Sequence, residues 1–178
     1  MNYFRKMRGT TTCPPRVSLS EICWSWLGAF VGISLVAYLN FTLLKGTGWL
    51  LLTGSLGASA LLIYGAIKAP FAQPRNLMGG HILSALIGVC AYKLMPGNLW
   101  LGSGVAVATS IAVMHATRTA HPPGSATALI AVIGDDTVHN LGFLFVLMPV
   151  AAGALILLVV ALIINNIPKS RRYPEYWF

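Results

Sequence analysis

One polar stretch, residues 114–125, interrupts an otherwise apolar chain and carries side chains that could bind an anion. Within it, Arg118 lies between His115 and His121, among several hydroxyl-bearing residues. An arginine far from a terminal basic cluster is costly in a membrane and normally faces a cavity or a partner. The chain has only four acidic residues, and all lie near the ends of predicted apolar segments. We therefore expect Arg118 to bind an anion, with the alternative that its side chain extends to the lipid headgroups.

The sequence His-Pro-Pro-Gly-Ser at the end of this stretch predicts the start of a helix. Proline suits the first turn of a helix because that position needs no N–H donor. The N-terminus of a helix attracts anions through its free N–H groups and its dipole. We therefore predict an anion-binding site at this turn, with the alternative that the prolines form only a rigid turn. The predicted residues of this half of the site are His115, Arg118, His121, Pro122, Pro123, Gly124 and Ser125.

A second polar group, Arg75, Asn76 and His81, follows a proline-containing break earlier in the chain. Near each group lies a similar run of small and aliphatic residues, 57–63 in the first half and 124–130 in the second. Interrupted segments in corresponding positions of two halves are typical of transporters in which both halves build one site. We therefore add these three residues to the predicted site. The alternatives are that the runs reflect close helix packing and that Arg75 is an ordinary loop charge.

The composition places these residues in a membrane. Apolar residues make up 56% of the 178 positions and charged residues only 9%, whereas soluble domains carry about 25% charged residues. Uncharged stretches of about 20 residues can cross a bilayer as helices. The sequence thus predicts an all-α polytopic membrane protein, a compact helical bundle with short half-helices, and excludes a soluble domain.

Polar and proline-containing breaks divide the chain into six apolar segments. Residues 123–134 are the exception, since a helix of this length spans only about 18 Å against a hydrocarbon thickness of about 30 Å. They predict a half-helix that either crosses or re-enters the membrane. The first case gives six crossings and the second gives five, or four if segment 49–67 is re-entrant as well. The other segments are 22–44, 77–95, 99–115 and 141–167, the last with a kink at Pro149.

Basic residues at both chain ends predict the topology. Because Lys and Arg near helix ends favour the cytoplasmic side, we expect a basic cytoplasmic segment at 1–21, a transmembrane domain at 22–167 and a basic tail at 168–178. Anionic lipids explain the net charge of +8, so we expect no nucleic-acid partner. The predicted location is a bacterial plasma (inner) membrane, with an organelle membrane as the alternative if the first segment is a presequence remnant.

The residue types give little support to an enzymatic, cofactor-binding or metal-binding function. The three cysteines show no C-x-x-C spacing, and the sequence has no nucleophile motif, no phosphate-binding loop and no paired carboxylates at membrane depth. We therefore expect neither an enzyme, nor a cofactor, nor a metal. Two facing histidines such as His81 and His115 could still hold a haem, so a haem-binding redox protein is one alternative function. A non-transporting membrane scaffold is the other.

Taken together, the motifs resemble those of the HPP family of small membrane proteins. The resemblance covers residues 20–167 or thereabouts, and rests on 57–63, Gln73-Pro-Arg-Asn76, Gly80-His81 and 115–124, which includes His-Pro-Pro. It implies a compact domain usually described as four transmembrane helices. It also implies transport, because cyanobacterial and chloroplast-envelope members are linked to nitrite transport.

We therefore predict that the protein transports a small monovalent anion, nitrite first, through the site around Arg118 and the His-Pro-Pro turn. Histidine is the only titratable residue type available at depth, so we expect His121 to link flux to pH, with His81 and His115 as alternatives. The small-residue face Gly102-Ser-Gly104 favours a homo-oligomer.

Overall fold

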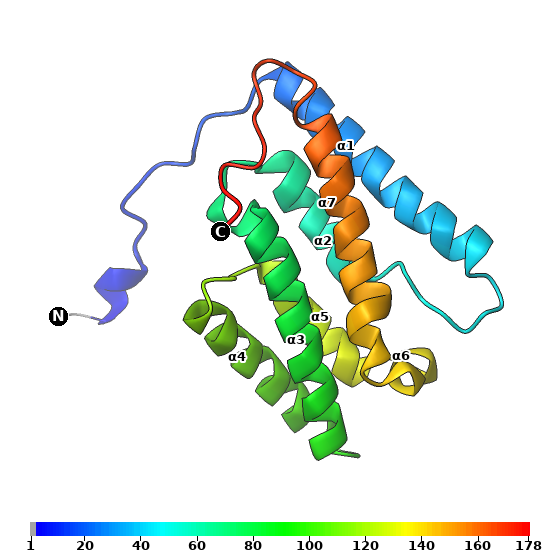
Figure 1. Ribbon diagram of the computed structural model, residues 1–178. Helices are drawn as coiled ribbons and strands as arrows, with labels where there is room; N and C mark the ends of the chain where they lie inside the picture. Colours follow the sequence, from blue (N-terminus) through cyan, green and yellow to red (C-terminus); the bar gives the residue numbers. More distant parts are fainter. Residues whose placement is uncertain (1–2) are drawn as a thin grey trace.

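The computed structural model describes residues 3–178, and every regular element in that range is helical (Figure 1). Four of the described helical stretches are long and apolar enough to cross a membrane. They are α1 (Leu19–Tyr38) continued by the π-helical η2 (Leu39–Leu43), α3 (Pro74–Leu94), α4 (Leu99–Ala116), and η5 (Val146–Ala151) continued by α7 (Ala152–Ile164). The shorter elements are η1 (Tyr3–Met7), α2 (Gly54–Ala60) continued by η3 (Leu61–Gly65), η4 (Pro70–Ala72), α5 (Pro122–Ile133) and α6 (Asp136–Leu141).

This arrangement confirms the predicted helical membrane protein. Residues 122–133 form the expected short helix, and the stretch at 54–65 is short as well because residues 49–53 are not helical. The order of a long, a short and a long helix occurs twice, as α1, α2 and α3 and then as α4, α5 and α7. The backbone of Met148 is non-helical immediately before Pro149, which is the predicted kink.

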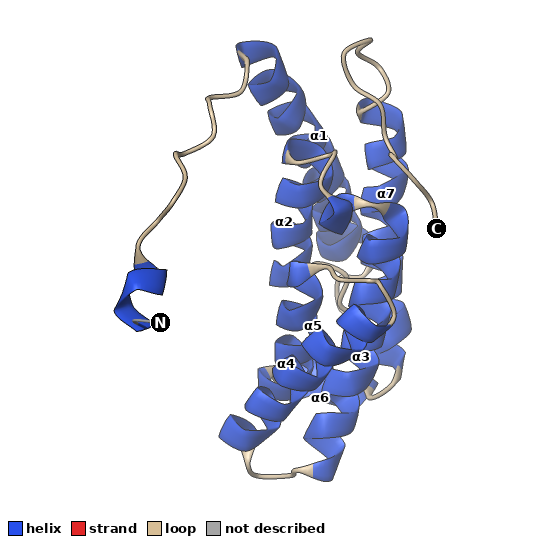
Figure 2. Cartoon of the chain, turned by 90° about the vertical axis from the view of Figure 1, so that its left-hand side faces the viewer, coloured by secondary structure: helices blue, strands red, loops and turns tan. Residues whose placement is uncertain are grey.

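The helices pack in two groups (Figure 2). In the first, α1, α2 and α7 enclose a core that includes Tyr64, whose hydroxyl donates to the Leu157 carbonyl at 3.0 Å. Gly28 and Gly32 of α1 make room for the tyrosine ring, since a Cβ at Gly28 would lie 2.6 Å from Tyr64 Cδ1. In the second group, α3 packs against α4 and α5. The two groups meet where the short helices α2 and α5 contact each other and where α3 contacts η5 and α7.

Small residues allow α5 to lie directly against α3. A Cβ at Gly88 would lie 2.5 Å from the Ala128 carbonyl oxygen, and one at Gly124 would lie 2.7 Å from the Gly80 carbonyl oxygen. Such small-residue stripes let the backbones of membrane helices approach closely. The close approach carries the residues at the start of α5 onto the middle of α3.

The start of α1 and the segment after α7 lie at the same end of the molecule. Arg171 reaches back to Glu21, with its Nε donating to Glu21 Oε2 at 3.0 Å. An even number of crossings returns the chain to its starting side, so this contact fits the counts of four and six and not the count of five.

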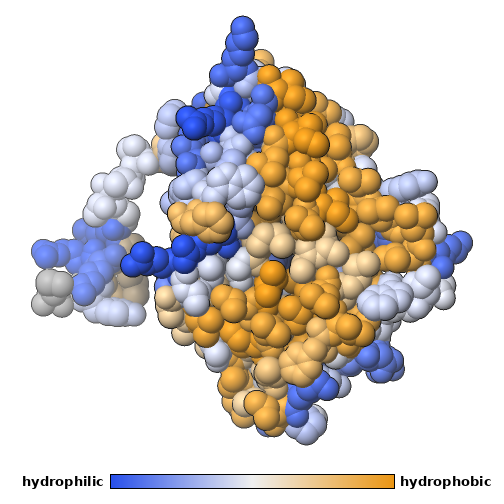
Figure 3. All heavy atoms as spheres, in the orientation of Figure 1, coloured by the Kyte–Doolittle hydropathy of each residue, from blue (hydrophilic) through white to orange (hydrophobic). Residues whose placement is uncertain are grey.

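Apolar side chains cover much of the outer surface. Figure 3 shows them over α1 and α7 in the upper part of the molecule and over α3 and α4 below. Large exposed examples are Trp26, Phe30, Leu94, Trp100 and Ile163. A water-exposed surface of this kind is unfavourable, whereas contact with lipid tails explains it.

Candidate functional site

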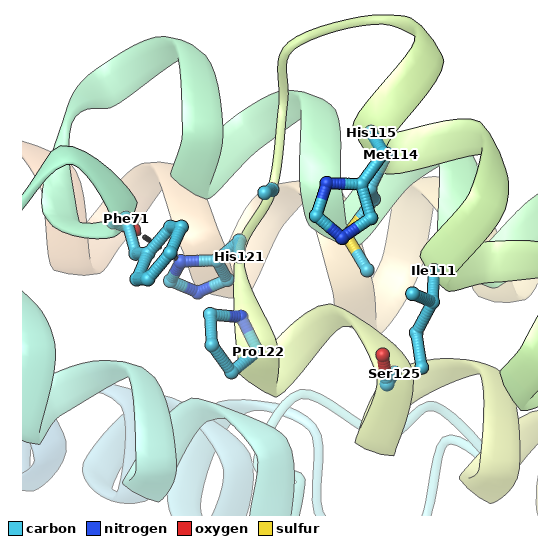
Figure 4. Close-up of a pocket in the computed structure, with 8 residues that line it drawn as sticks. Phe71, Ile111, Met114, His115, His121, Pro122 and Ser125 are labelled. Carbon is cyan, nitrogen blue, oxygen red and sulfur yellow. Dashed lines mark hydrogen bonds between the residues drawn. The ribbon is translucent and has the colours of Figure 1, made fainter. Parts of the chain in front are cut away.

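A cavity of about 350 Å³ lies at the connection between α4 and α5. Figure 4 shows His121 next to Phe71 on one side of it and His115 next to Met114 on the other. The cavity thus brings together four residues of the predicted site with several apolar ones. Its lining residues are Phe71, Ile111, Met114, His115, Ala120, His121, Pro122 and Ser125.

His121 lines this cavity from the N-cap of α5, and its side chain is fully buried. Its Nδ1 lies 2.7 Å from the Phe71 carbonyl oxygen and its Nε2 lies 2.8 Å from Ser59 Oγ. A carbonyl oxygen can only accept, so Nδ1 carries a hydrogen.

His81 of α3 lies beside His121, with their ring centroids 4.9 Å apart. It is also fully buried. Its Nε2 lies 2.7 Å from Ser59 Oγ, and its Nδ1 lies 2.7 Å from Thr127 Oγ1. The hydroxyl of Ser59 therefore bridges the two histidines, and the short helices α2 and α5 each supply one hydroxyl to the cluster. Ser59, His81, His121 and Thr127 are called the histidine cluster below.

Residues at the start of α3 hold the loop that lines the cavity. Arg75 Nη2 donates to the Thr117 carbonyl and Asn76 Nδ2 donates to the Ala120 carbonyl, both at 2.8 Å. Within the described residues, the buried Asn76 Oδ1 and Ser84 Oγ have no hydrogen-bond partner. Ser84 lies beside the start of α5, since a Cβ at Gly124 would be 3.0 Å from its Oγ. Unsatisfied polar atoms are thus available close to the cavity.

The structure places Arg118 differently from the other predicted residues. It is exposed, is absent from the cavity wall, and has a left-handed backbone (φ 57°) in the turn that follows α4. Its side chain makes no hydrogen bond to any residue in the range 3–178. Arg118 thus has no partner among the described residues, as expected, but it lies at the surface instead of in the cavity wall, which matches the alternative in which the arginine extends outward.

The first turn of α5 also offers fewer donors than expected. Pro122 and Pro123 occupy its first two positions and have no N–H group. The next N–H, that of Gly124, donates to the His121 carbonyl at 2.7 Å. The prolines thus fix the start of the helix and the position of His121, and the polar groups of the site come mainly from side chains.

Sequence reasoning missed Ser59 and Thr127, which complete the histidine cluster. Both lie inside the matched small-residue runs, and a hydroxyl within each run was the available signal. Their contacts join residues 62 and 46 positions apart, as in Ser59 to His121 and His81 to Thr127. Periodicity along the chain does not reveal such contacts.

The geometry argues against the haem alternative. A haem iron with two axial histidines needs the rings on opposite faces of the macrocycle, and rings with centroids 4.9 Å apart leave no room between them. Both nitrogens of His81 are already hydrogen-bonded, and His115 is exposed. Among the described residues, no group of three or more His, Cys, Asp or Glu side chains is placed to hold a metal ion.

Comparisons with known proteins agree with this architecture. Two transmembrane proteins of Dictyostelium discoideum are 43% identical over 181 residues and 42% identical over 183 residues. Each match covers the whole of this chain but only 58% and 64% of the relatives, so the chain spans about three fifths of their length. No solved structure is significantly similar. A bacterial plasma membrane stays a prediction, since both relatives come from Dictyostelium.

A family model described as the transmembrane region of HPP proteins matches residues 14–174. The match takes in the four long helices, both short helices and the histidine cluster. The chain therefore belongs to the HPP family of integral membrane proteins.

Proposed function

We propose that this protein transports a small monovalent anion across the membrane, and that nitrite is its substrate. The observation that carries the proposal is the cavity lined by the buried His121, which is hydrogen-bonded to Ser59 where the short helices α2 and α5 meet. In transporters, discontinuous or short helices meet near the middle of the membrane and build the substrate site there.

The charges around the cavity favour an anion over a cation. Arg75 and Arg118 both belong to the part of the chain that frames the loop at 117–121. The acidic residues lie elsewhere: Glu21 is paired with Arg171, Asp135 caps α6, and Asp136 and Glu175 are exposed. The cavity therefore has cations near its loop and, among the described residues, no carboxylate on its wall.

Nitrite suits the cavity for two reasons. The wall is mainly apolar, with His115, His121 and Ser125 as its polar residues. A small and weakly hydrated anion therefore loses less hydration free energy on entering the cavity than a strongly hydrated anion does. The resemblance to HPP proteins linked to nitrite points to the same substrate.

Flux in proteoliposomes tests the proposal. The purified protein should move nitrite faster than protein-free liposomes at pH 7.5, with nitrate, formate and chloride as competitors. Ser125→Leu fills the cavity and removes a hydroxyl, and should lower nitrite flux at least tenfold. Ala126→Leu adds similar bulk at the next position of α5, outside the cavity wall, and should keep most of the flux. A parent protein with no flux above the liposome background would leave the scaffold alternative standing.

A further inference from the structure

The Ser59 hydroxyl occupies an unusual position between two imidazole rings. Its Oγ lies 2.7 Å from His81 Nε2 and 2.8 Å from His121 Nε2, and all three side chains are fully buried. A hydroxyl has one hydrogen and two lone pairs, so it can donate to one ring and accept from the other. This fixes the hydrogen positions of the whole cluster.

The neutral cluster has one arrangement that satisfies every group. Because His121 Nδ1 donates to the Phe71 carbonyl, His121 Nε2 is bare and accepts from the Ser59 hydroxyl. Ser59 Oγ then accepts from His81 Nε2–H, which leaves His81 Nδ1 bare. That nitrogen accepts from the Thr127 hydroxyl. The two histidines are therefore opposite tautomers, with the hydrogen on Nδ1 of His121 and on Nε2 of His81.

The cluster can also hold one extra proton without leaving a group unsatisfied. Ser59 Oγ lies 3.1 Å from the Ser55 carbonyl, and Thr127 Oγ1 lies 3.3 Å from the Pro123 carbonyl. If His121 Nε2 gains a proton, it donates to Ser59 Oγ, and the Ser59 hydrogen turns to the Ser55 carbonyl. A proton on His81 Nδ1 is accommodated by Thr127 in the same way. Two protons would place two cations in rings only 4.9 Å apart, so one is the limit.

Among the described residues, no carboxylate contacts the histidine cluster to balance that proton. The neighbours are the uncharged Ser59 and Ser55 of α2, the Phe71 carbonyl of η4 and Thr127 of α5. The neighbours on α3 are Asn76 and Ser84, and those on α4 are Met114 and the exposed His115. The charged group of Arg75 is hydrogen-bonded to the Thr117 carbonyl. None of the four acidic side chains is buried. An anion in the cavity beside His121 would be the nearest counter-charge.

We propose that the Ser59-bridged pair of His81 and His121 is a binding site for one proton, filled when an anion enters the cavity. This inference rests on the proposed anion transport. On one side of the membrane an O–H bond of hydronium breaks as a histidine N–H bond forms, and on the other side that N–H bond breaks as the proton returns to a water molecule. Because linkage is reciprocal, the anion raises proton affinity by the same factor by which the proton raises anion affinity. Nitrite and proton together carry no net charge.

Nitrogen-15 NMR of histidine-labelled protein in bilayers tests the site directly. In the parent protein, with the signals of the other two histidines identified from the His115→Asn and His139→Asn variants, the remaining two rings should show one bare nitrogen each at pH 7.5, Nε2 in His121 and Nδ1 in His81. Acidification should add one proton to the pair, and 10 mM nitrite should raise the pH of that uptake by at least half a unit. Identical tautomers, two independent uptakes or no effect of nitrite would overturn the proposal.

Measurements of nitrite uptake distinguish the proton site from the proposed transport function. Initial nitrite uptake should follow an imposed pH gradient, inside alkaline, and should not respond to a membrane potential, since the pair of ions is neutral. Ser59→Ala removes the bridge, so its pH-driven uptake should fall to the rate of protein-free liposomes, and any uptake that remains should follow the potential. Ser55→Ala, one turn earlier on α2, keeps the carbonyl and loses only a contact to Thr53, and should behave like the parent.

The outcomes are distinct. Proton uptake by the pair with the stated tautomers, but no nitrite flux, would overturn the proposed function and leave the proton site in place. Nitrite flux that stays pH-driven in Ser59→Ala would overturn the proton site and leave the transport function in place.

Discussion

Arg171 and Glu21 form an ion pair across 150 positions of the chain, with Arg171 Nη2 2.9 Å from Glu21 Oε2. The arginine side chain is almost fully buried and also donates to the Tyr64 carbonyl, to Asn165 Oδ1 and to Ser25 Oγ. The segment after α7 is thereby joined to the start of α1 and to the end of η3.

Replacing Arg171 tests how much its ion pair with Glu21 contributes to the stability of the folded protein. Arg171→Ala should destabilise the protein by about 3 kcal/mol, because removing one partner of a buried pair leaves the other groups unsatisfied. Thermal unfolding in detergent should show a clearly lower midpoint. Arg172→Ala is the matched control: Arg172 is exposed, and its loss should shift the midpoint little. Equal midpoints for the two variants would contradict the structural role of Arg171.

The same segment reaches the candidate site through η4. Tyr173 donates from its hydroxyl to the Ala72 carbonyl at 2.7 Å, and Glu175 donates from its N–H to Gln73 Oε1 at 2.8 Å. Phe71, whose carbonyl accepts from His121, immediately precedes Ala72 in the chain. Burial raises the pKa of Tyr173, so its hydroxyl stays protonated and keeps donating in alkaline solution. The C-terminal segment therefore fixes the acceptor that sets the tautomer of His121.

Gly88→Ala tests the close approach of α3 and α5. The added Cβ would lie 2.5 Å from the Ala128 carbonyl oxygen, which belongs to backbone and must shift. We expect a loss of about 1–3 kcal/mol in the free energy of unfolding, and weaker contact within the histidine cluster. Gly104→Ala on α4 meets nothing within 4 Å and should be neutral or stabilising. Thermal midpoints compare the two, and similar values would contradict the proposed packing.

Sequence reasoning identified much of this architecture and less of the site. Prolines at 122 and 123 and the glycine at 134 predicted α5, because these residue types favour helix starts and ends. Arg118 and Arg171 were harder, because residue type alone does not separate an exposed arginine from a buried one. Arg118 itself has a left-handed backbone in the turn after α4 and is exposed, while Arg171 is buried and paired with Glu21, which is far away in sequence. Both outcomes depend on tertiary contacts.

Arg118 should act on the approach of the anion and not on its binding inside the cavity. The side chain is exposed and absent from the cavity wall, so its charge can raise the local anion concentration through a field that salt screens. We expect Arg118→Ala to raise the half-saturating nitrite concentration severalfold at low ionic strength, with the maximal flux within about twofold of the parent. The difference should shrink in 0.5 M salt, where the screening length is only a few ångströms. Arg118→Lys keeps the charge and should resemble the parent, because an exposed site does not need the planar guanidinium group. Loss of all flux in Arg118→Ala at every salt concentration would instead mean that Arg118 binds the anion during transport.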